Sequence, residues 1–296
     1  MNISLARTFL AVLEHRNFNR AAEILNVTQS TVTMRINSLE DRIGQKLFLR
    51  NRAGVEPTAA GWAFRPYAEM LIQVWQQARQ EVTLPIERST LFRVGAEPGL
   101  WQGVMEDWVL KITQERPGIS LLIENKTADN LNACLAQGIY DAALMYDARP
   151  RTNVAFDFLY DEQLVLVSTT PRGRTAWHPE YTYVEGGPDF RMEHAKLQPE
   201  NITPPVTINH GSWALQWIER RGGSAYFPIR MIEDKVERGE LYVVPGINAF
   251  SRSVWISYLE RLMQSEWFPP VLQDLQEMAR LRSERNVAFK KRWNVK

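Results

Sequence analysis

The sequence predicts a multi-domain protein with an all-α N-terminal module, a long linker helix and an α/β domain after it. Two short amphipathic helices joined by a tight turn span residues 19–43. Apolar residues at strict heptad spacing follow between positions 64 and 82. From position 91 onward, short apolar strands alternate with helical patterns, which is typical of an α/β domain with parallel strands. A chain of 296 residues is long enough for two or more domains.

A first helix, about Ser4 to His15, places Leu5, Phe9 and Val12 on one side, where they would pack beneath the helix pair. In the second helix of the pair, Ile36, Leu39 and Ile43 fall within about 40° of Val32 around the helix axis. We expect this aliphatic stripe to be buried, and Gly44 to end the helix.

The opposite side of the second helix carries short residues that could approach the edges of base pairs: Ser30, Met34 and Asn37, flanked by Thr31, Thr33 and Ser38. Thr28 is the expected N-cap, because its hydroxyl can accept a free N–H of the first turn. This arrangement is typical of a helix-turn-helix, whose second helix enters the major groove of DNA. Taken alone, the stretch is also compatible with an ordinary amphipathic helix pair.

Two extended pieces, Leu47–Arg50 and Val55–Thr58, flank a turn that contains Gly54, and they predict a small β-hairpin. The hairpin carries Arg50 and Arg52. Guanidinium groups beside a recognition helix suggest a wing placed over phosphates or the minor groove. The alternative for both arginines is a solvated turn.

One long helix is expected from Thr58 to Leu84, ended by Pro85. Its heptad seam, spaced 4, 3, 4, 3 and 4, consists of Phe64, Ala68, Leu71, Trp75, Ala78 and Val82. Such a seam favours pairing with a second copy of the chain, giving a homodimer or homotetramer. Docking against the second domain is the alternative. Pro66 removes one hydrogen bond and would bend the helix near its start.

The strands expected in the α/β domain are Leu91–Ala96, Ile119–Asn125, Ala142–Tyr146, Leu164–Ser168, Tyr181–Val184, Ser224–Phe227 and Leu241–Val244. The helices expected between them are Leu100–Gln114, Asp129–Gln137, Trp213–Arg221 and Ile229–Arg238. Ligands of such sheets bind at the carboxyl ends of strands, where helix N-termini offer free N–H groups.

The composition describes a soluble globular protein, with 45% hydrophobic and 23% charged residues. Apolar runs are too short for a membrane span, and the N-terminus reads as a first helix and not as a secretion signal. The single cysteine excludes an internal disulfide and suits a reducing cytoplasm. Residues 1–60 carry a net charge of +3 and the remainder −2, a split that suits a nucleic-acid module attached to a near-neutral domain.

The stretch Phe18–Gly61 contains RAAEIL, TQSTVT, INSLED, IG, LF and PTAAG, and through these motifs the chain resembles the LysR-type transcriptional regulators. The later YFPIRMIEDKVERGEL fits the family's effector domain more loosely. The resemblance implies DNA binding as a dimer or tetramer through paired linker helices. It also implies an effector domain of two α/β subdomains, like a periplasmic binding protein, with a small molecule in the cleft.

On this basis we expect a winged helix-turn-helix domain at 1–60, a linker and dimerisation helix at 61–88, and an effector-binding domain at 89–296. Within the last, subdomain I would comprise about 89–161 and 266–296, and subdomain II about 162–265. The expected partners are double-stranded DNA and a small-molecule effector, with RNA polymerase as a further candidate and no membrane. No cofactor, metal or enzymatic activity is expected.

The resemblance carries base contacts onto Gln29, Ser30 and Thr33, and wing contacts onto Arg50 and Arg52. Glutamine can read adenine, and threonine methyls can meet thymine methyls. Many family members have arginine where this chain has Met34, which suggests contact with a thymine methyl in place of the guanine or phosphate contact that an arginine would make. Position 30 is often proline in the family, and Ser30 could restore a phosphate contact. The full expected DNA-binding set is Thr28, Gln29, Ser30, Thr31, Thr33, Met34, Arg35, Asn37, Arg50 and Arg52.

The loops after the expected strands could form a cleft with aromatic walls and polar groups. The candidate effector contacts are Glu97, Trp101, Thr127, Tyr146, Asp147 and Trp213. Aromatic faces with nearby carboxylates suit a cationic or amphipathic ligand. The alternative is that these aromatic residues belong to the core, since the chain has 10 tryptophans.

The other candidate residues are expected to have structural roles. Cys134 shares a helix face with two leucines and should be core. The four histidines are too scattered for a metal site, and Lys290-Lys291-Arg292 reads as a solvated basic tail. Two other classes of protein compete with a regulator: a solute-binding protein, disfavoured by the lack of a secretion signal, and an enzyme, for which no nucleophile–base constellation stands out.

Overall fold

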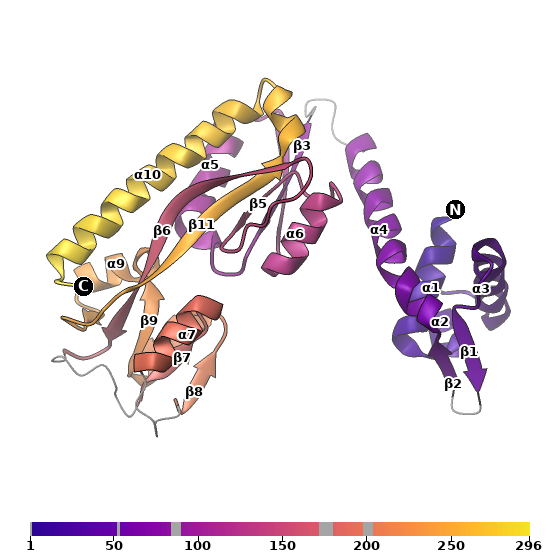
Figure 1. Cartoon of the computed structure of the whole chain (residues 1–296), viewed down its shortest axis with the longest axis horizontal. Coiled ribbons are helices and arrows are strands. Elements are labelled where there is room, and N and C mark those ends of the chain that lie inside the picture. Colours follow the sequence, from indigo (N-terminus) through magenta and orange to yellow (C-terminus); the bar gives the residue numbers. More distant parts are fainter. Residues whose placement is uncertain (1, 52–53, 84–89, 172–179, 198–203) are drawn as a thin grey trace. The chain divides into compact units, whose positions relative to one another are not determined.

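The computed structural model describes residues 2–51, 54–83, 90–171, 180–197 and 204–296. The contacts within the chain divide it into two compact units, Met1–Pro85 and Ile86–Lys296 (Figure 1). The helix expected to act as a linker therefore forms one unit with the N-terminal module. No helix among the described residues is long and apolar enough to cross a membrane.

The first unit is a winged helix-turn-helix followed by a long helix. Its elements are α1 (Ile3–His15), α2 (Phe18–Ile24), α3 (Gln29–Ile43), β1 (Phe48–Asn51), β2 (Gly54–Pro57) and α4 (Ala59–Val82). Strands β1 and β2 pair antiparallel as the expected hairpin. Helix α4 contains Pro66 and is continuous from end to end.

The core of the first unit lies beneath α3. Phe9 of α1 is fully buried between the rings of Phe48 and Phe64, with centroids 5.3 and 5.0 Å away. The stripe of α3 is buried at Val32, Ile36 and Leu39, as predicted. The prediction was wrong for Ile43, which is 38% exposed because α3 ends at the left-handed Gly44, beyond the edge of the core.

The second unit is built on a mixed seven-stranded sheet in the order β10-β6-β11-β5-β3-β4, with β9 also paired to β6. The strands are β3 (Thr90–Ala96), β4 (Ile119–Asn125), β5 (Ala142–Met145), β6 (Val154–Ser168), β9 (Ser224–Pro228), β10 (Tyr242–Val243) and β11 (Phe250–Leu259). β3 runs parallel to β4 and β5, whereas β11 pairs antiparallel with both β5 and β6. The prediction of parallel strands therefore holds only for part of the sheet. A separate parallel pair consists of β7 (Thr182–Val184) and β8 (Val206–Ile208).

Helices cover this framework. They are α5 (Glu106–Glu115), α6 (Ala128–Ala136), α7 (Pro188–Leu197), α8 (Gly211–Arg221), α9 (Ile229–Glu237) and α10 (Phe268–Arg292), together with the short η1 (Trp101–Met105) and η2 (Glu260–Gln264). The helix expected at 100–114 is interrupted, because Gln102 and Gly103 adopt non-helical angles. The predicted basic tail Lys290-Lys291-Arg292 is instead the last turn of α10.

Two main hydrophobic cores lie along the sheet of the second unit. One surrounds Phe92 and Trp108, and the other surrounds Val165 and Phe227. Helix α10 runs along the sheet (Figure 1) and contributes Leu275 to the first core and Phe289 to the second. The division into subdomains at 162 and 266 stays a prediction, but α10 contacts both cores and β6 crosses the first boundary.

Candidate DNA-binding face and effector cavity

The start of α3 is held by a group of hydroxyls. The Oγ1 atom of Thr28 accepts the backbone N–H of Thr31 at 3.2 Å, as an N-cap should. The same oxygen lies 2.8 Å from the hydroxyls of Ser30 and Thr31. These hydrogen bonds fix the orientation of the first turn of α3.

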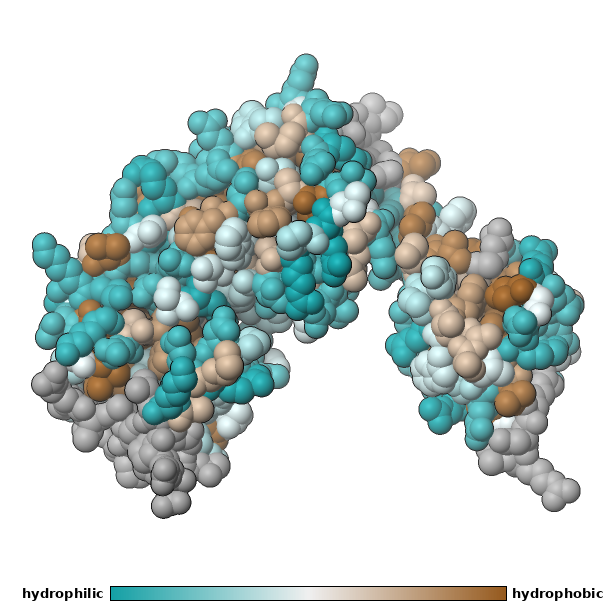
Figure 2. Space-filling view, viewed as in Figure 1, coloured by the Kyte–Doolittle hydropathy of each residue, from teal (hydrophilic) through white to brown (hydrophobic). Residues whose placement is uncertain are grey.

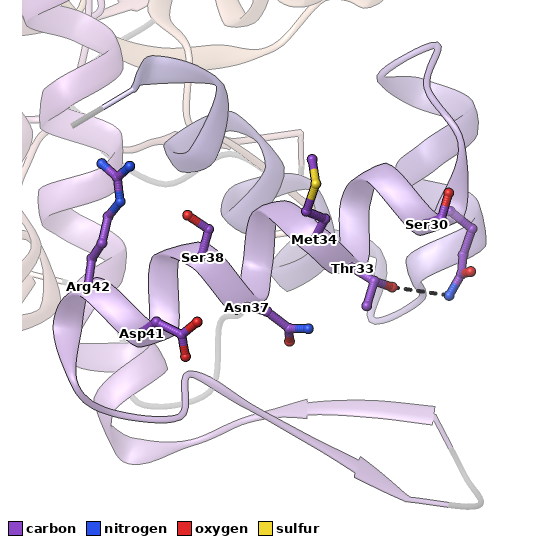
Figure 3. A pocket seen from close by; sticks show the side chains of 8 residues that line it. Ser30, Thr33, Met34, Asn37, Ser38, Asp41 and Arg42 are labelled. Atoms are coloured by element: carbon purple, nitrogen blue, oxygen red, sulfur yellow. Dashed lines mark hydrogen bonds between the residues drawn. The ribbon is translucent and has the colours of Figure 1, made fainter.

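The outward face of α3 forms a shallow concave surface (Figure 3). Its lining residues are Gln29, Ser30, Thr33, Met34, Asn37, Ser38, Asp41 and Arg42. The Nε2 atom of Gln29 donates to the Oγ1 atom of Thr33 at 3.3 Å. Met34 is 64% exposed, the one large hydrophobic side chain on this face. The surface can offer amide and hydroxyl groups and one flexible thioether to a ligand.

Five of the ten residues predicted to contact DNA come together on this surface: Gln29, Ser30, Thr33, Met34 and Asn37. Sequence analysis did not include Ser38, Asp41 and Arg42 in the set. They continue the same helix face, four residues after Met34, Asn37 and Ser38 respectively, so helical periodicity could have found them.

The remaining predicted DNA contacts lie elsewhere. Thr28 and Thr31 belong to the cap, and Arg35 is half-buried with its Nη1 donating to Thr8 of α1 at 3.3 Å. Arg50 lies on β1 opposite Val55, but its side chain and the whole of Arg52 lie outside the described residues.

Glu40 joins the recognition helix to the wing, a role that sequence analysis missed. Its side chain is 5% exposed. Oε1 accepts the backbone N–H groups of Leu47 and Phe48 at 2.9 and 3.2 Å, and Oε2 accepts from Lys46 Nζ at 2.7 Å. The sequence did hold a signal for this role, namely an acidic residue directly next to the aliphatic stripe of α3.

The heptad seam of α4 has two parts. Phe64 and Ala68 pack against the core of the first unit. Farther along, Leu71, Trp75, Ala78 and Val82 are exposed, with Trp75 at 46% and Val82 at 86%. Figure 2 shows hydrophobic atoms at the surface along this helix. The distal part of the seam is thus not covered by the core of its own unit.

A cavity of about 490 Å³ opens in the second unit at the carboxyl ends of β3 and β4. It is lined by Ala96, Glu97, Pro98, Gly99, Trp101, Gln102, Ile123, Glu124, Asn125, His210 and Ser212. Of the predicted effector contacts, Glu97 and Trp101 line it, whereas Thr127, Tyr146, Asp147 and Trp213 do not.

The four outlying residues have other neighbours. Trp213 is 63% exposed and stacks on His210, with ring centroids 4.9 Å apart. Asp147 forms an ion pair with Arg149, and Thr127 is exposed at the start of α6. Tyr146 contacts Glu97 through its backbone N–H, which donates to Oε1 of that carboxyl at 2.8 Å.

Glu97 is the partly buried acid of the cavity. Burial raises its pKa, and the N–H of Tyr146 and the positive charge of Arg252 oppose that rise only in part. The ionised carboxylate is therefore under-solvated, and a cation bound beside it would be favoured.

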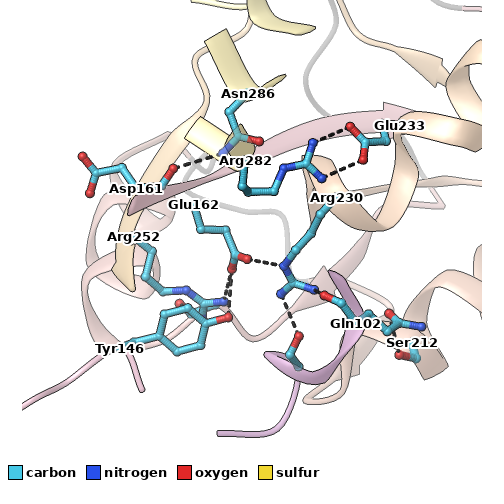
Figure 4. A network of polar contacts seen from close by, with 12 residues as sticks. Gln102, Tyr146, Asp161, Glu162, Ser212, Arg230, Glu233, Arg252, Arg282 and Asn286 are labelled. Atoms are coloured by element: carbon cyan, nitrogen blue, oxygen red, sulfur yellow. Dashed lines mark hydrogen bonds and ion pairs between the residues drawn. The ribbon is translucent and has the colours of Figure 1, made fainter. Parts of the chain in front are cut away.

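A buried network of charges lies next to the cavity (Figure 4). Glu162 on β6 forms ion pairs with Arg230 of α9 at 2.6 Å and with Arg252 of β11 at 2.8 Å. Burial alone would raise the pKa of Glu162, but the two guanidinium groups outweigh it and hold the pKa at about 2. Sequence analysis missed all three residues, since they lie far apart in the chain and only Glu162 adjoins a predicted strand.

Other polar candidates are structural. Cys134 is buried in the core, as predicted, and burial raises the pKa of its thiol. His194 is buried with its Nε2 atom 2.7 Å from the Tyr181 hydroxyl. Within the part of the chain that the structure describes, no three His, Cys, Asp or Glu residues gather in a way that could hold a metal ion.

A winged helix with an open polar recognition face, followed by a domain with a ligand-sized cavity, defines a DNA-binding regulator that senses a small molecule. Residues 3–62 match the bacterial regulatory helix-turn-helix protein family, lysR, and residues 87–280 match the LysR substrate binding domain. The chain belongs to the LysR family and is a helix-turn-helix transcriptional regulator with an effector-binding domain.

Individual relatives agree with this assignment. The transcriptional regulator HdfR of Salmonella schwarzengrund (strain CVM19633) is 31% identical over 263 residues, which cover 88% of this chain and 93% of HdfR. The structure of CbnR, a LysR family transcriptional regulator, is 18% identical with a TM-score of 0.66 and covers 96% of this chain and 99% of CbnR. Full-length LysG of Corynebacterium glutamicum with bound effector Arg is 15% identical with a TM-score of 0.52, covering 94% and 98%. The matched relatives are regulators and not enzymes.

Proposed function

We propose that the protein binds an inverted-repeat operator as a dimer or tetramer, with α3 of each copy in the major groove. The observation that supports this most is the division of α3 into an anchored side and an open one. Val32, Ile36 and Leu39 hold the helix from beneath, while the polar face of Gln29, Thr33 and Asn37 is open. Two such helices related by a twofold axis would read half-sites about 34 Å apart, or a multiple of that distance.

The proposed base contacts are the residues on the open face, with Arg42 and the wing arginines Arg50 and Arg52 directed to the backbone. Amide groups read adenine, and a thioether or threonine methyl can meet a thymine methyl. Asp41 at the end of the same face disfavours phosphates nearby, which restricts where the helix can sit in the groove. Thr28, Thr31 and Arg35 would act by orienting the helix.

The proposed dimer contact is the distal part of the α4 seam. Leu71, Trp75, Ala78 and Val82 repeat at heptad spacing and are exposed, so that pairing with the same helix of a second copy would bury all of them. The proximal residues Phe64 and Ala68 already serve the core of the winged helix, so a dimer built on α4 would be directly connected to the DNA-binding domains.

We propose that the effector occupies the cavity at the ends of β3 and β4, with Glu97 and Trp101 as principal contacts and Gln102, His210 and Ser212 around them. LysG binds the effector Arg, and a partly buried carboxylate beside an aromatic ring likewise suits a cationic group here. We further propose that the protein acts in the cytoplasm and that RNA polymerase is a partner at the promoter.

The operator, identified by genome-wide footprinting, allows a direct test by fluorescence anisotropy. Thr33→Ala should weaken operator binding about tenfold, while Thr207→Ala, at an exposed threonine on β8 of the second unit, should leave it unchanged. Affinity should also fall steeply with salt, because phosphate contacts release counterions. If no operator is found, or if Thr33→Ala binds as tightly as the Thr207→Ala control, the proposal is wrong.

A further inference from the structure

One carboxylate lies at the meeting point of strands β6 and β11 with α9 and the segment after β5. Glu162 on β6 stands directly opposite Arg252 on β11 in the antiparallel pair. Its side chain is 2% exposed, as is that of Arg230, and that of Arg252 is 21% exposed. The carboxylate is thus enclosed by residues that are distant in the sequence.

Both oxygens of this carboxylate are fully engaged. Oε1 accepts from Arg230 Nε at 2.6 Å. Oε2 accepts from Arg252 Nη2 at 2.8 Å and from the Tyr146 hydroxyl at 2.8 Å. The guanidinium of Arg252 also lies over the Tyr146 ring, 3.3 Å from its centroid. Two cations and a phenol in these positions form a complete set of donors for a carboxylate.

Arg230 links this site to the effector cavity. Its Nη2 and Nη1 atoms donate to the carbonyl oxygens of Gly99 and Gln102 at 2.7 and 2.8 Å, and both of those residues line the cavity. At Gly103, where φ is +93°, an added Cβ would lie 3.3 Å from Arg230 Cδ. The wall of the cavity therefore follows the backbone of η1 and rests on the Arg230 side chain.

Two buried guanidinium groups need a counter-charge. Burying a charge is costly unless it is paired and hydrogen-bonded, and removing one partner leaves the others uncompensated. Within the network, Glu162 is the carboxylate in ion-pair contact with both Arg230 and Arg252. Without it, the two arginines and Tyr146 would surround an empty space about as large as an acetate ion.

We propose that Arg230, Arg252 and the Tyr146 hydroxyl form a binding site for a small monocarboxylate, and that the chain fills this site with its own Glu162. Glu162 then acts as a built-in ligand that holds the Gly99–Gln102 wall in place without any bound molecule. The inference rests on the proposed function in one respect, namely that the neighbouring cavity holds the effector. In that case the effector meets the carboxylate of Glu97, because the donors that both arginines direct into the neighbouring site are already taken by Glu162.

The test empties the site and offers it a free carboxylate. In the full-length Glu162→Ala variant, sodium acetate should raise the unfolding temperature by about 3–5 °C once its concentration exceeds the dissociation constant tenfold. Acetamide, which has the same shape but no charge, and sodium chloride at matched ionic strength should not do so. Glu162→Gln fills the space with a neutral group of the same size, so acetate should have no greater effect on it than on the wild type.

Two further variants distinguish acetate binding at the emptied site from an effect of acetate on the protein surface. Glu237→Ala breaks an exposed ion pair with Arg292 and should show no acetate response. Arg230→Met combined with Glu162→Ala should lose the response. If Glu162→Ala is isolated unfolded, its refolding yield should rise with acetate and not with acetamide.

Equal effects of acetate and acetamide on Glu162→Ala, or an acetate response as large in Glu162→Gln or Glu237→Ala, would overturn the proposal. So would an acetate response that survives the loss of Arg230, and so would no response at all. These measurements use neither DNA nor effector. Failure to find an operator would therefore contradict the proposed function and leave the acetate result standing.

Discussion

Replacing Glu40 should separate the wing from the recognition helix. Glu40→Ala removes the acceptor of two buried backbone N–H groups, those of Leu47 and Phe48, at the start of β1. It also removes a partner of Lys46 Nζ. The side chain of Glu40 is 5% exposed, so water cannot simply replace the carboxylate.

The magnitude follows from these contacts. Each buried donor left without a partner costs about 1–3 kcal/mol, so the alanine variant, which leaves two, should lose about 2–6 kcal/mol of stability in the first unit. Glu40→Gln keeps an oxygen where Oε1 lies and loses mainly the bond to Lys46, whose side chain is 65% exposed. The glutamine variant should therefore lose only about 1 kcal/mol.

The assay is amide hydrogen exchange of the peptide that contains Leu47 and Phe48, measured on the full-length protein. Exchange should accelerate at least about thirtyfold in Glu40→Ala, because every 1.4 kcal/mol is a factor of ten. Glu56→Ala, an exposed glutamate on β2 of the same wing, is the matched control and should change exchange little. Equal exchange in the Glu40→Ala and Glu56→Ala variants, or equal damage by alanine and glutamine at position 40, would refute the reasoning.

Three other changes have expected outcomes. Replacing by deoxyuracil the operator thymine that Met34 contacts should weaken wild-type binding about fourfold, while Met34→Ala should bind the original and this substituted operator equally; a gel shift with singly substituted operators measures this. Trp75→Ala should weaken dimerisation at least about tenfold in sedimentation equilibrium, whereas Tyr242→Ala, an exposed aromatic of the second unit, should not. The pKa of Glu162 falls from its usual 4.5 to about 2 on folding, so its contribution is present above pH 4.5 and lost as the pH falls toward 2. In urea unfolding, the free energy of unfolding of the wild type should fall by about 3 kcal/mol more than that of Glu162→Gln between pH 4.5 and pH 2. An equal fall in the two proteins would contradict the lowered pKa of Glu162.

The first unit could be predicted almost completely, because its signals are local. The N-cap Thr28, the stripe of Val32, Ile36 and Leu39, and the stop at Gly44 all follow from residues within a few positions of one another. Ile43 shows the limit of this reasoning, since periodicity places it on the stripe but only the tertiary structure shows where the core ends.

The second unit was predicted less well, because its decisive contacts are non-local. The antiparallel pairing of β6 with β11 joins segments almost a hundred residues apart, and β11 alternates polar with apolar residues only loosely. The same pairing creates the Glu162–Arg252 ion pair. Charged residues in strands are usually solvent-exposed, so nothing local marks these two as buried partners.

The residues that line the cavity could be predicted only in part, for a related reason. The rule that ligands bind in the loops after strands led to Glu97 and Trp101, and both line the cavity. It led to the segment before α8 but to Trp213 in place of His210 and Ser212, because packing between distant elements decides which side chains of a loop face the cavity.

The most direct test of the central claim is to locate α3 on the operator. Asn37→Cys, carrying a tethered iron–EDTA group, places a DNA-cleaving reagent on the exposed face, while the native Cys134 is buried. We expect strand cleavage at two positions that are related by the symmetry of the operator and lie about 34 Å, or a multiple of it, apart. Cleavage spread evenly along the DNA, or identical to that from the same reagent at Thr207→Cys, would contradict it.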